Sequence, residues 1–126
     1  MIRLKRAYEP ASAHDGYRIL VERLWPRGVR KKDLQLDAWL KDIAPSHELR
    51  RWFGHDPARW SEFAARYRRE LHESPAAEAV ADVVRRASLQ AITLVYGARD
   101  ERHNGAVVLR GVIESALTER PRQAHP

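Results

Sequence analysis

The feature that most constrains the fold is one nearly continuous apolar segment late in the chain. Residues Ala91 to Tyr96 read Ala-Ile-Thr-Leu-Val-Tyr and contain no charged side chain. Such a run is typical of a strand that is buried on both faces, as in a parallel sheet. Together with the strands and helices predicted on either side of it, the run favours an α/β fold with a small, mainly parallel sheet flanked by helices.

Two segments near the N-terminus are also predicted to be strands. Residues Ile2 to Arg6 alternate between apolar and basic side chains, and Tyr17 to Leu24 is rich in β-branched and large apolar residues. Pro26 and Gly28 should end the second strand, because proline cannot donate to a sheet and glycine permits a turn. Residues Leu36 to Ile43 fit either a short helix or a strand, with a strand favoured in the second half.

Helices are predicted from capping residues and apolar periodicity. Ser46 can cap a short helix that Gly54 closes, and Asp56-Pro57 combines a carboxylate cap with proline at the first helical position. The helix after Pro57 has one apolar stripe, formed by Trp60, Phe63, Ala64, Tyr67 and Leu71. This stripe should face the protein core.

Two more helices are expected towards the C-terminus. Ser74-Pro75 repeats the cap-and-proline pattern, and apolar residues follow at helical spacing: Val80, Val83, Val84 and Ala87. Residues Gly105 to Leu117 predict a well-buried helix. With 126 residues and no linker, the chain fits a single domain over residues 1–117. Residues 118–126 contain two prolines and are expected to form a disordered tail.

Composition excludes several classes of function. The chain contains no cysteine, which excludes disulfides, thiolate nucleophiles and cysteine-bound zinc. No apolar run approaches the ~18 residues that a membrane span needs. Met1 to Arg6 carries charge where a signal peptide would be apolar, so we expect a cytoplasmic protein. No metal site is predicted, because no close-spaced cluster or i, i+4 helical pair occurs among the histidines at positions 14, 47, 55, 72, 103 and 125.

Two segments that should follow strands are the candidate site. Ligands of open α/β sheets bind beyond the carboxyl ends of the strands. One segment runs from Arg23 to Gly28 and the other from Tyr96 to Asn104. His103 could transfer a proton, with Asp100 orienting it, so these two are the candidate catalytic residues. Arginine can grip a phosphate or carboxylate through two hydrogen bonds. The candidate ligand-binding residues are Arg23, Trp25, Arg27, Arg99 and Asn104.

Structural roles could also explain part of this set. Asp100 or Asn104 could simply cap the last helix, and Arg99 could be solvated. In the same way, capping explains Asp56 fully but leaves the neighbouring His55 without a role. Only a geometry that brings the two segments to one cleft would support a binding site.

The basic composition suggests a second function. The net charge is +6, and 19 of the 23 basic residues are arginine. Such a surface attracts nucleic acid. The arginines that could form it are Arg50, Arg51, Arg59, Arg66, Arg68 and Arg69. However, acidic residues are interspersed with basic ones, which is equally typical of an ordinary solvated surface. A non-catalytic interaction domain is the third possibility.

Several short motifs match a known family. They are Asp15–Arg18, Arg23–Gly28, Leu36–Trp39, Ala44–Ser46, Leu49–Pro57, Ala98–Asp100, His103–Asn104 and Ala106–Leu109. In these motifs, over about residues 2 to 115, the chain resembles the YeaO-like family, also classed as domain of unknown function 488. The resemblance implies a single-domain cytoplasmic α/β protein. It implies no particular substrate, cofactor or partner, so the working hypothesis is an anion-binding cleft, with hydrolase-type chemistry as one form of it.

Overall fold

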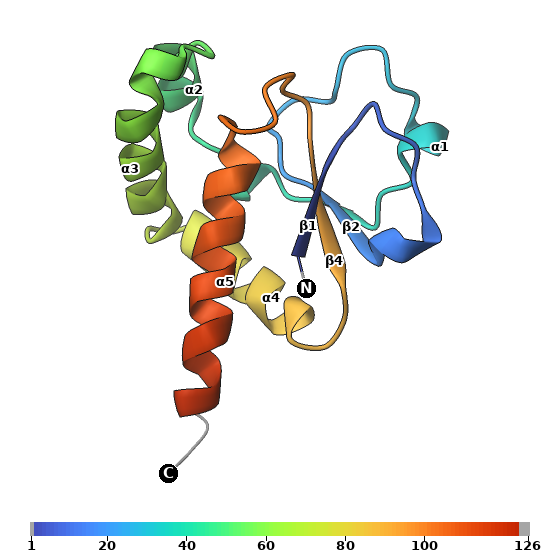
Figure 1. Cartoon of the computed structure of the whole chain (residues 1–126), viewed down its shortest axis with the longest axis vertical. Coiled ribbons are helices and arrows are strands. Elements are labelled where there is room, and N and C mark those ends of the chain that lie inside the picture. Colours follow the sequence, from blue (N-terminus) through green and yellow to red (C-terminus); the bar gives the residue numbers. More distant parts are fainter. Residues whose placement is uncertain (1, 124–126) are drawn as a thin grey trace.

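A four-stranded parallel sheet is the centre of the protein. The computed structural model describes residues 2–123, with side chains up to residue 119. The strands are β1 (Ile2–Arg6), β2 (Tyr17–Leu20), β3 (Ala38–Trp39) and β4 (Ile92–Tyr96). Their order in the sheet is β1-β4-β2-β3, and every neighbouring pair is parallel. The predicted α/β fold with a small parallel sheet is confirmed (Figure 1).

The apolar strand β4 is buried on both faces, as its sequence predicts, and it lies between β1 and β2 in the sheet. It pairs with β1 on one side and with β2 on the other. Its side chains alternate between the two faces: Ile92 and Leu94 enter the main core, whereas Val95 enters a smaller cluster on the other face. Every residue of β4 is buried. Both faces are therefore covered, which explains why the strand has no polar face.

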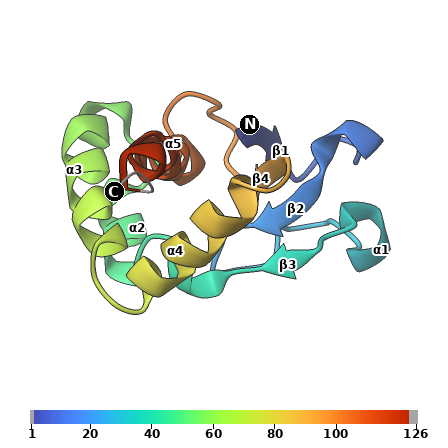
Figure 2. The same cartoon turned by 90° about the horizontal axis from the view of Figure 1, so that it is seen from below.

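Helices cover one face of the sheet, and a long loop segment covers the other. The helices are α1 (Lys31–Leu34), α2 (His47–Phe53), α3 (Trp60–Leu71), α4 (Ala76–Ala87) and α5 (Gly105–Gln123). Figures 1 and 2 show α2 to α5 grouped on one side, with the short α1 and its flanking loops on the other. The predicted stripe of α3 faces the core, where Phe63 and Tyr67 are almost fully buried. The main core therefore lies between the sheet and the long helices.

A buried ion-pair cluster attaches the loop between β1 and β2 to the sheet. The carboxylate of Asp15 accepts hydrogen bonds from Arg18 Nη1 at 2.6 Å and from Lys5 Nζ at 3.1 Å. Its backbone carbonyl accepts the hydroxyl of Thr93 in β4 at 2.7 Å. Gly16 follows with φ +65°, and a Cβ there would lie 2.3 Å from the carbonyl oxygen of Ala91. Glycine is therefore required where the chain enters β2.

Two predictions for the N-terminal half need correction. The strand predicted over Tyr17–Leu24 ends at Leu20. The segment Leu36–Ile43 is neither one helix nor one strand: two residues form β3, and residues Lys41–Ile43 form a 3-10 turn. The short helix α1 was not predicted. It is a single turn without apolar periodicity, so the pattern that identifies longer helices is missing.

Two predictions for the C-terminal half also change. Ser74 does not cap α4 by binding a backbone N–H; its hydroxyl instead donates to the carboxylate of Glu78 at 2.6 Å. Helix α5 continues past Leu117 to Gln123. The expected tail is therefore helical as far as residue 123, and residues 124–126 lie outside the described residues. None of the helices in residues 2–123 has the length and apolarity that crossing a membrane requires.

Candidate functional site

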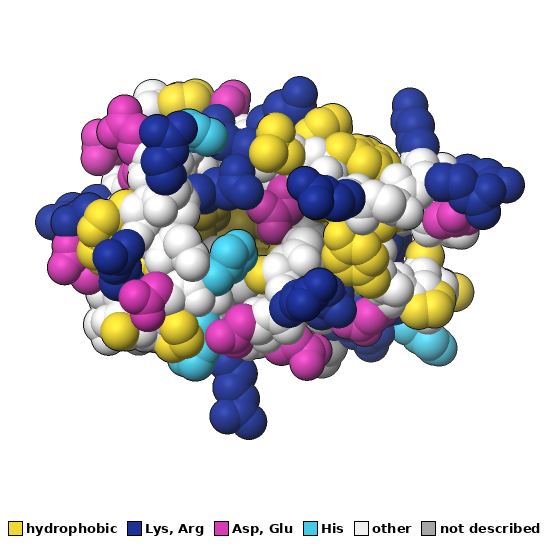
Figure 3. Space-filling view, turned by 90° about the horizontal axis from the view of Figure 1, so that it is seen from above, with side chains coloured by type: hydrophobic (Ala, Val, Ile, Leu, Met, Phe, Trp, Pro, Cys, Tyr) yellow, Lys and Arg dark blue, Asp and Glu magenta, His cyan; other side chains and the backbone are white. Residues whose placement is uncertain are grey.

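A cavity of about 670 Å³ opens at the carboxyl ends of β2 and β4. Its walls come from the loop after β2, helix α2, the loop after β4 and the first turn of α5. Figure 3 looks onto this edge of the sheet and shows a hollow with basic and histidine side chains around it and acidic atoms within it. The volume lies within the range of roughly 300–1,000 Å³ that is usual for small-molecule sites.

Helix α2 supplies the basic wall of the cavity. His47, Arg50 and Arg51 line the cavity, and their spacing of three and four residues places them on one helix face. Ser46 accepts the N–H of Leu49 at 3.2 Å, as predicted for a cap, and Gly54 closes the helix with φ +54°. The length and start of α2, and thus the place of its basic face, follow from these two caps.

Contacts with α3 hold this wall in place. The N–H of Ser46 donates to Glu70 in α3 at 2.8 Å, and the Ser46 hydroxyl donates to the same carboxylate at 2.6 Å. At the other end of α2, the ring of Phe53 stacks on Phe63 with a centroid distance of 4.2 Å. Helix α2 is thus fixed to α3 at both ends, so its arginines project from a rigid support.

The start of α5 forms another wall. Asn104 is buried; its side-chain oxygen accepts the N–H of Val107 at 3.1 Å, and its amide nitrogen donates to the carbonyl of Asp100 at 2.9 Å. Asn104 therefore caps α5, the structural role considered from the sequence. Gly105 and Ala106 line the cavity. The positive end of a 19-residue helix dipole therefore lies at the cavity edge.

Two guanidinium groups at the cavity have no acceptor in the described residues. Arg27 and Arg50 line the cavity, and no carboxylate, carbonyl or ring within residues 2–119 binds their side-chain N–H groups. Arg23 differs: its Nε donates to the carbonyl of Pro45 at 2.8 Å and its Nη2 to that of Ala44 at 3.3 Å. Arg27 and Arg50 therefore keep their donors for a ligand, whereas Arg23 holds two loops together.

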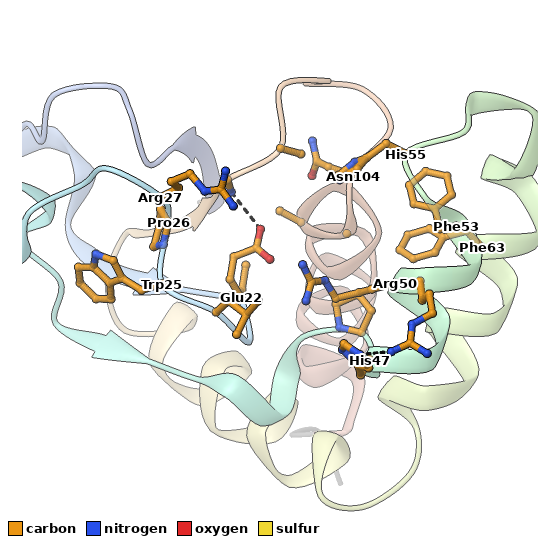
Figure 4. A pocket seen from close by; sticks show the side chains of 18 of the residues that line it. Glu22, Trp25, Pro26, Arg27, His47, Arg50, Phe53, His55, Phe63 and Asn104 are labelled. Carbon is orange, nitrogen blue, oxygen red and sulfur yellow. Dashed lines mark hydrogen bonds between the residues drawn. The ribbon is translucent and has the colours of Figure 1, made fainter.

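The structure brings three of the seven predicted site residues to one cavity. Trp25, Arg27 and Asn104 all line it, although the first two lie about 80 positions before Asn104 in the chain. The indole N–H of Trp25 donates to the carbonyl of Val29 at 2.6 Å, and the ring packs edge-on against Trp39. Trp25 therefore offers only part of its ring to the cavity. In Figure 4 it lies on the same side as Arg27.

The other four predicted residues do not line the cavity. Arg23 is a structural link, and Arg99 is exposed on the loop after β4. Asp100 and His103 do form the predicted pair, with 2.9 Å between Oδ2 and Nδ1, but the pair lies outside the cavity and His103 packs edge-on against Trp60. A substrate bound in this cavity would therefore not contact Asp100 or His103, so the cavity does not support their proposed catalytic roles.

Local hydrogen bonds explain the charge state of Asp100. Its Oδ1 accepts the backbone N–H groups of Arg102 and His103, each at 2.9 Å. These two bonds, followed by the bond to the His103 ring, lower the pKa of Asp100 to about 2. The carboxylate thus stabilises the loop that leads into α5.

Sequence reasoning missed most of the cavity-lining polar residues. The missed residues are Glu22, His47 and His55, and the sequence suggests Arg50 and Arg51 only as part of a nucleic-acid-binding surface. The spacing of residues 47, 50 and 51 already places three basic or imidazole groups on one helix face, so a signal was present. His55 had no structural role in the sequence; it adopts φ +57° and packs against Phe53. The role of Glu22 depends on a contact with Gly97, 75 positions away.

The arginines considered for nucleic-acid binding divide into separate groups. Arg50 and Arg51 belong to the cavity. Arg59 and Arg66 both lie over the ring of Trp52, at 5.3 and 4.4 Å from its centroid. Arg68 and Arg69 lie exposed on α3. Within the described part of the chain, no three His, Asp or Glu side chains come together as a metal site would require.

The comparisons with known proteins agree with the motif resemblance. The family model described as "Inactive DUF488-N3 subclade", DUF488-N3i, matches residues 1–126. The chain is 44% identical to the uncharacterized protein YeaO of Escherichia coli over 116 residues, which are 90% of this chain and 97% of the relative.

A mycobacterial relative shows similar likeness. The uncharacterized protein Rv3073c of Mycobacterium tuberculosis is 43% identical over 108 residues, 86% of this chain and 89% of the relative. No solved structure matches the chain. With a family model that spans all 126 residues and relatives that match nearly end to end, the chain belongs to the DUF488-N3i family of YeaO-like proteins.

Proposed function

We propose that this protein binds a small anionic molecule, of the phosphate or phosphoester class, in the cavity at the carboxyl ends of β2 and β4. The observation on which the proposal depends is that Arg27 and Arg50 face one cavity with guanidinium groups that no described residue satisfies. A guanidinium presents donors in a planar fork that fits phosphate and carboxylate oxygens.

Two further features support an anionic ligand with an apolar part. The first turn of α5 adds the positive end of a helix dipole and backbone N–H groups at the same cavity. Trp25 also lines the cavity, and the buried rings of Phe53 and Phe63 lie behind its wall. A ligand with one charged end and one planar or apolar end would use both kinds of wall.

We propose binding rather than turnover. The Asp100–His103 pair, the sequence-based candidate for hydrolase-type chemistry, does not line this cavity. The matching family model is also described as an inactive subclade. A protein that recognises an anionic ligand without converting it accounts for both observations. A cytoplasmic location stays a prediction from the sequence.

The experiment is a calorimetric titration of the full chain with adenosine 5′-monophosphate and with inorganic phosphate, at low and at physiological salt. It measures the dissociation constant of each compound. Arg50→Met removes one of the guanidinium groups at the cavity and keeps an unbranched apolar stem in its place. It should weaken binding about tenfold or more, as expected for loss of a charge-assisted hydrogen bond. Arg68→Met makes the same charge change on exposed α3 and should leave affinity unchanged.

Three results of this titration would each contradict a different part of the proposal. No binding of either compound by the wild-type protein at millimolar concentration would refute the proposal. Equal weakening by Arg50→Met and Arg68→Met would mean that net charge, not the cavity, attracts the anion. Release of phosphate or nucleoside during the titration would show turnover and overturn the binding-only part.

A further inference from the structure

Glu22 is a carboxylate in a cavity whose other charged side chains are basic. It lies two positions after the end of β2 and lines the same cavity as Arg27 and Arg50. In Figure 4 its side chain projects into the cavity between the sides that carry these two arginines. A negative charge at this place repels a simple anion such as phosphate. Glu22 can therefore discriminate between anionic ligands according to what else they carry.

The position of Glu22 is fixed at both its backbone and its side chain. Its carbonyl oxygen accepts the indole N–H of Trp39 at 2.6 Å. Its Oε2 accepts the backbone N–H of Gly97, just after β4, at 3.0 Å, which is the dashed line at Glu22 in Figure 4. The carboxylate therefore spans the ends of two strands and does not depend on a ligand for its orientation.

One oxygen of this fixed carboxylate remains available. No donor in the described residues binds Oε1 of Glu22, and the side chain is only half-buried. An ionised carboxylate can only accept hydrogen bonds. A ligand that offers an N–H or O–H group gains a charge-assisted bond there, whereas one without a donor leaves the carboxylate partly desolvated and unpaired.

Building on the proposed function, we infer that Glu22 makes the cavity selective for anions whose uncharged part has an N–H or O–H donor, the chemistry of nucleoside monophosphates. The arginines bind the charged end, and Glu22 Oε1 accepts from a base amino group or a ribose hydroxyl. Simple phosphate, which has no such second part, is disfavoured by the same carboxylate.

The variant Glu22→Gln tests this selectivity because Gly97 determines how the amide must turn. The N–H of Gly97 needs an acceptor, so the amide oxygen takes the place of Oε2 and the NH₂ group takes the place of Oε1. The substitution thus converts an acceptor that faces the ligand into a donor and removes the charge. Glu101→Gln makes the same charge change on an exposed residue of the loop after β4, outside the cavity lining, and is the matched control.

The measurement is the ratio of two dissociation constants, that of methyl phosphate over that of adenosine 5′-monophosphate, in the wild-type protein and both variants. Glu22→Gln should lower this ratio about tenfold, the size of one charge-assisted hydrogen bond, and Glu101→Gln should not change it. A ratio that stays the same in Glu22→Gln, with both ligands still bound, would overturn the selectivity and leave the anion-binding function intact. Failure of wild type and variants to bind either ligand would overturn both.

A second measurement needs no variant of the protein. Wild type is titrated with the 6-deamino and the 2′,3′-dideoxy analogues of adenosine 5′-monophosphate, each of which lacks one kind of donor. At least one of them should bind about tenfold more weakly than the parent nucleotide. Unchanged affinity for both analogues, while the parent nucleotide binds, would contradict a donor contact at Glu22.

Discussion

Replacing Asp15 with asparagine should destabilise the protein strongly, because every partner of its carboxylate is a hydrogen-bond donor. Arg18, Lys5 and the backbone N–H of Ser12 all donate to it, at 2.6 to 3.2 Å. Asparagine has nearly the same shape, but one end of its amide is itself a donor. That end would face a donor in a site where Asp15 and Arg18 are only 2% and 4% exposed.

The expected loss is about 3–5 kcal/mol, the range for removing one partner of a buried ion pair. For a domain of this size, each kcal/mol lowers the melting temperature by roughly 3–5 °C, so a fall of about 10–20 °C is expected. Urea denaturation measures the free energy directly. Asp33→Asn is the matched control: this carboxylate pairs with Arg30 on the surface, with the two side chains 52% and 71% exposed. It should change stability by less than about 0.5 kcal/mol.

The difference between wild type and Asp15→Asn should also depend on pH. Burial raises the pKa of Asp15, but hydrogen bonds from Ser12, Lys5 and Arg18 outweigh burial, and the net pKa is lowered. A lowered folded-state pKa adds stability that is fully present above the ordinary value near about 3.9 and is lost as pH falls through the folded-state pKa. The gap in unfolding free energy should therefore shrink below about pH 4. Two results would refute the stabilising role of the Asp15 ion-pair cluster. One is a loss of unfolding free energy under about 1 kcal/mol at pH 7. The other is a difference between wild type and variant that stays constant down to pH 3.

Three other predictions concern the loop before α5 and the basic surface. Asn104→Ala should lower the free energy of unfolding by about 0.5–2 kcal/mol through loss of the α5 cap, measured by urea denaturation; no change would contradict the capping role. The carboxyl of Asp100 should titrate with a midpoint of about 2 in an NMR pH titration, and His103→Ala should move that midpoint upwards while leaving nucleotide affinity unchanged, since His103 lies outside the cavity. If α3 binds nucleic acid, DNA affinity at 50 mM salt should fall steeply with added salt and weaken in Arg68→Ala with Arg69→Ala; undetectable binding at low salt would exclude that function.

The elements that the sequence predicts well are those whose signal is local. The apolar run of β4 indicates a strand buried on both faces, because such a strand has no charged side chain to expose to solvent. The cap Ser46 and the closing Gly54 indicate the limits of α2 in the same way, because both act through bonds to nearby backbone groups. The confirmed family resemblance adds to this reading without supplying a role for any residue.

The sequence predicts poorly those elements whose limits depend on contacts with residues far away in the chain. Residues 17–24 are rich in β-branched and large apolar side chains, yet β2 stops at Leu20. Beyond it, the carbonyl of Glu22 accepts the indole N–H of Trp39, and its carboxylate accepts the N–H of Gly97. Strand propensity reflects only the neighbouring residues and contains no information on these partners.

The same reasoning applies to the arginines of the candidate site. Arg23 and Arg27 are four positions apart in one loop, and nothing in their neighbourhood in the sequence distinguishes a structural arginine from a binding one. Folding distinguishes them: two carbonyl oxygens near Ser46 satisfy the guanidinium of Arg23, and that of Arg27 meets no acceptor within the described residues. A guanidinium already bound to carbonyls can turn to a ligand only by leaving those carbonyls unpaired. The hydrogen-bond state of each arginine after folding, rather than its place in a motif, therefore decides which of them can hold an anion.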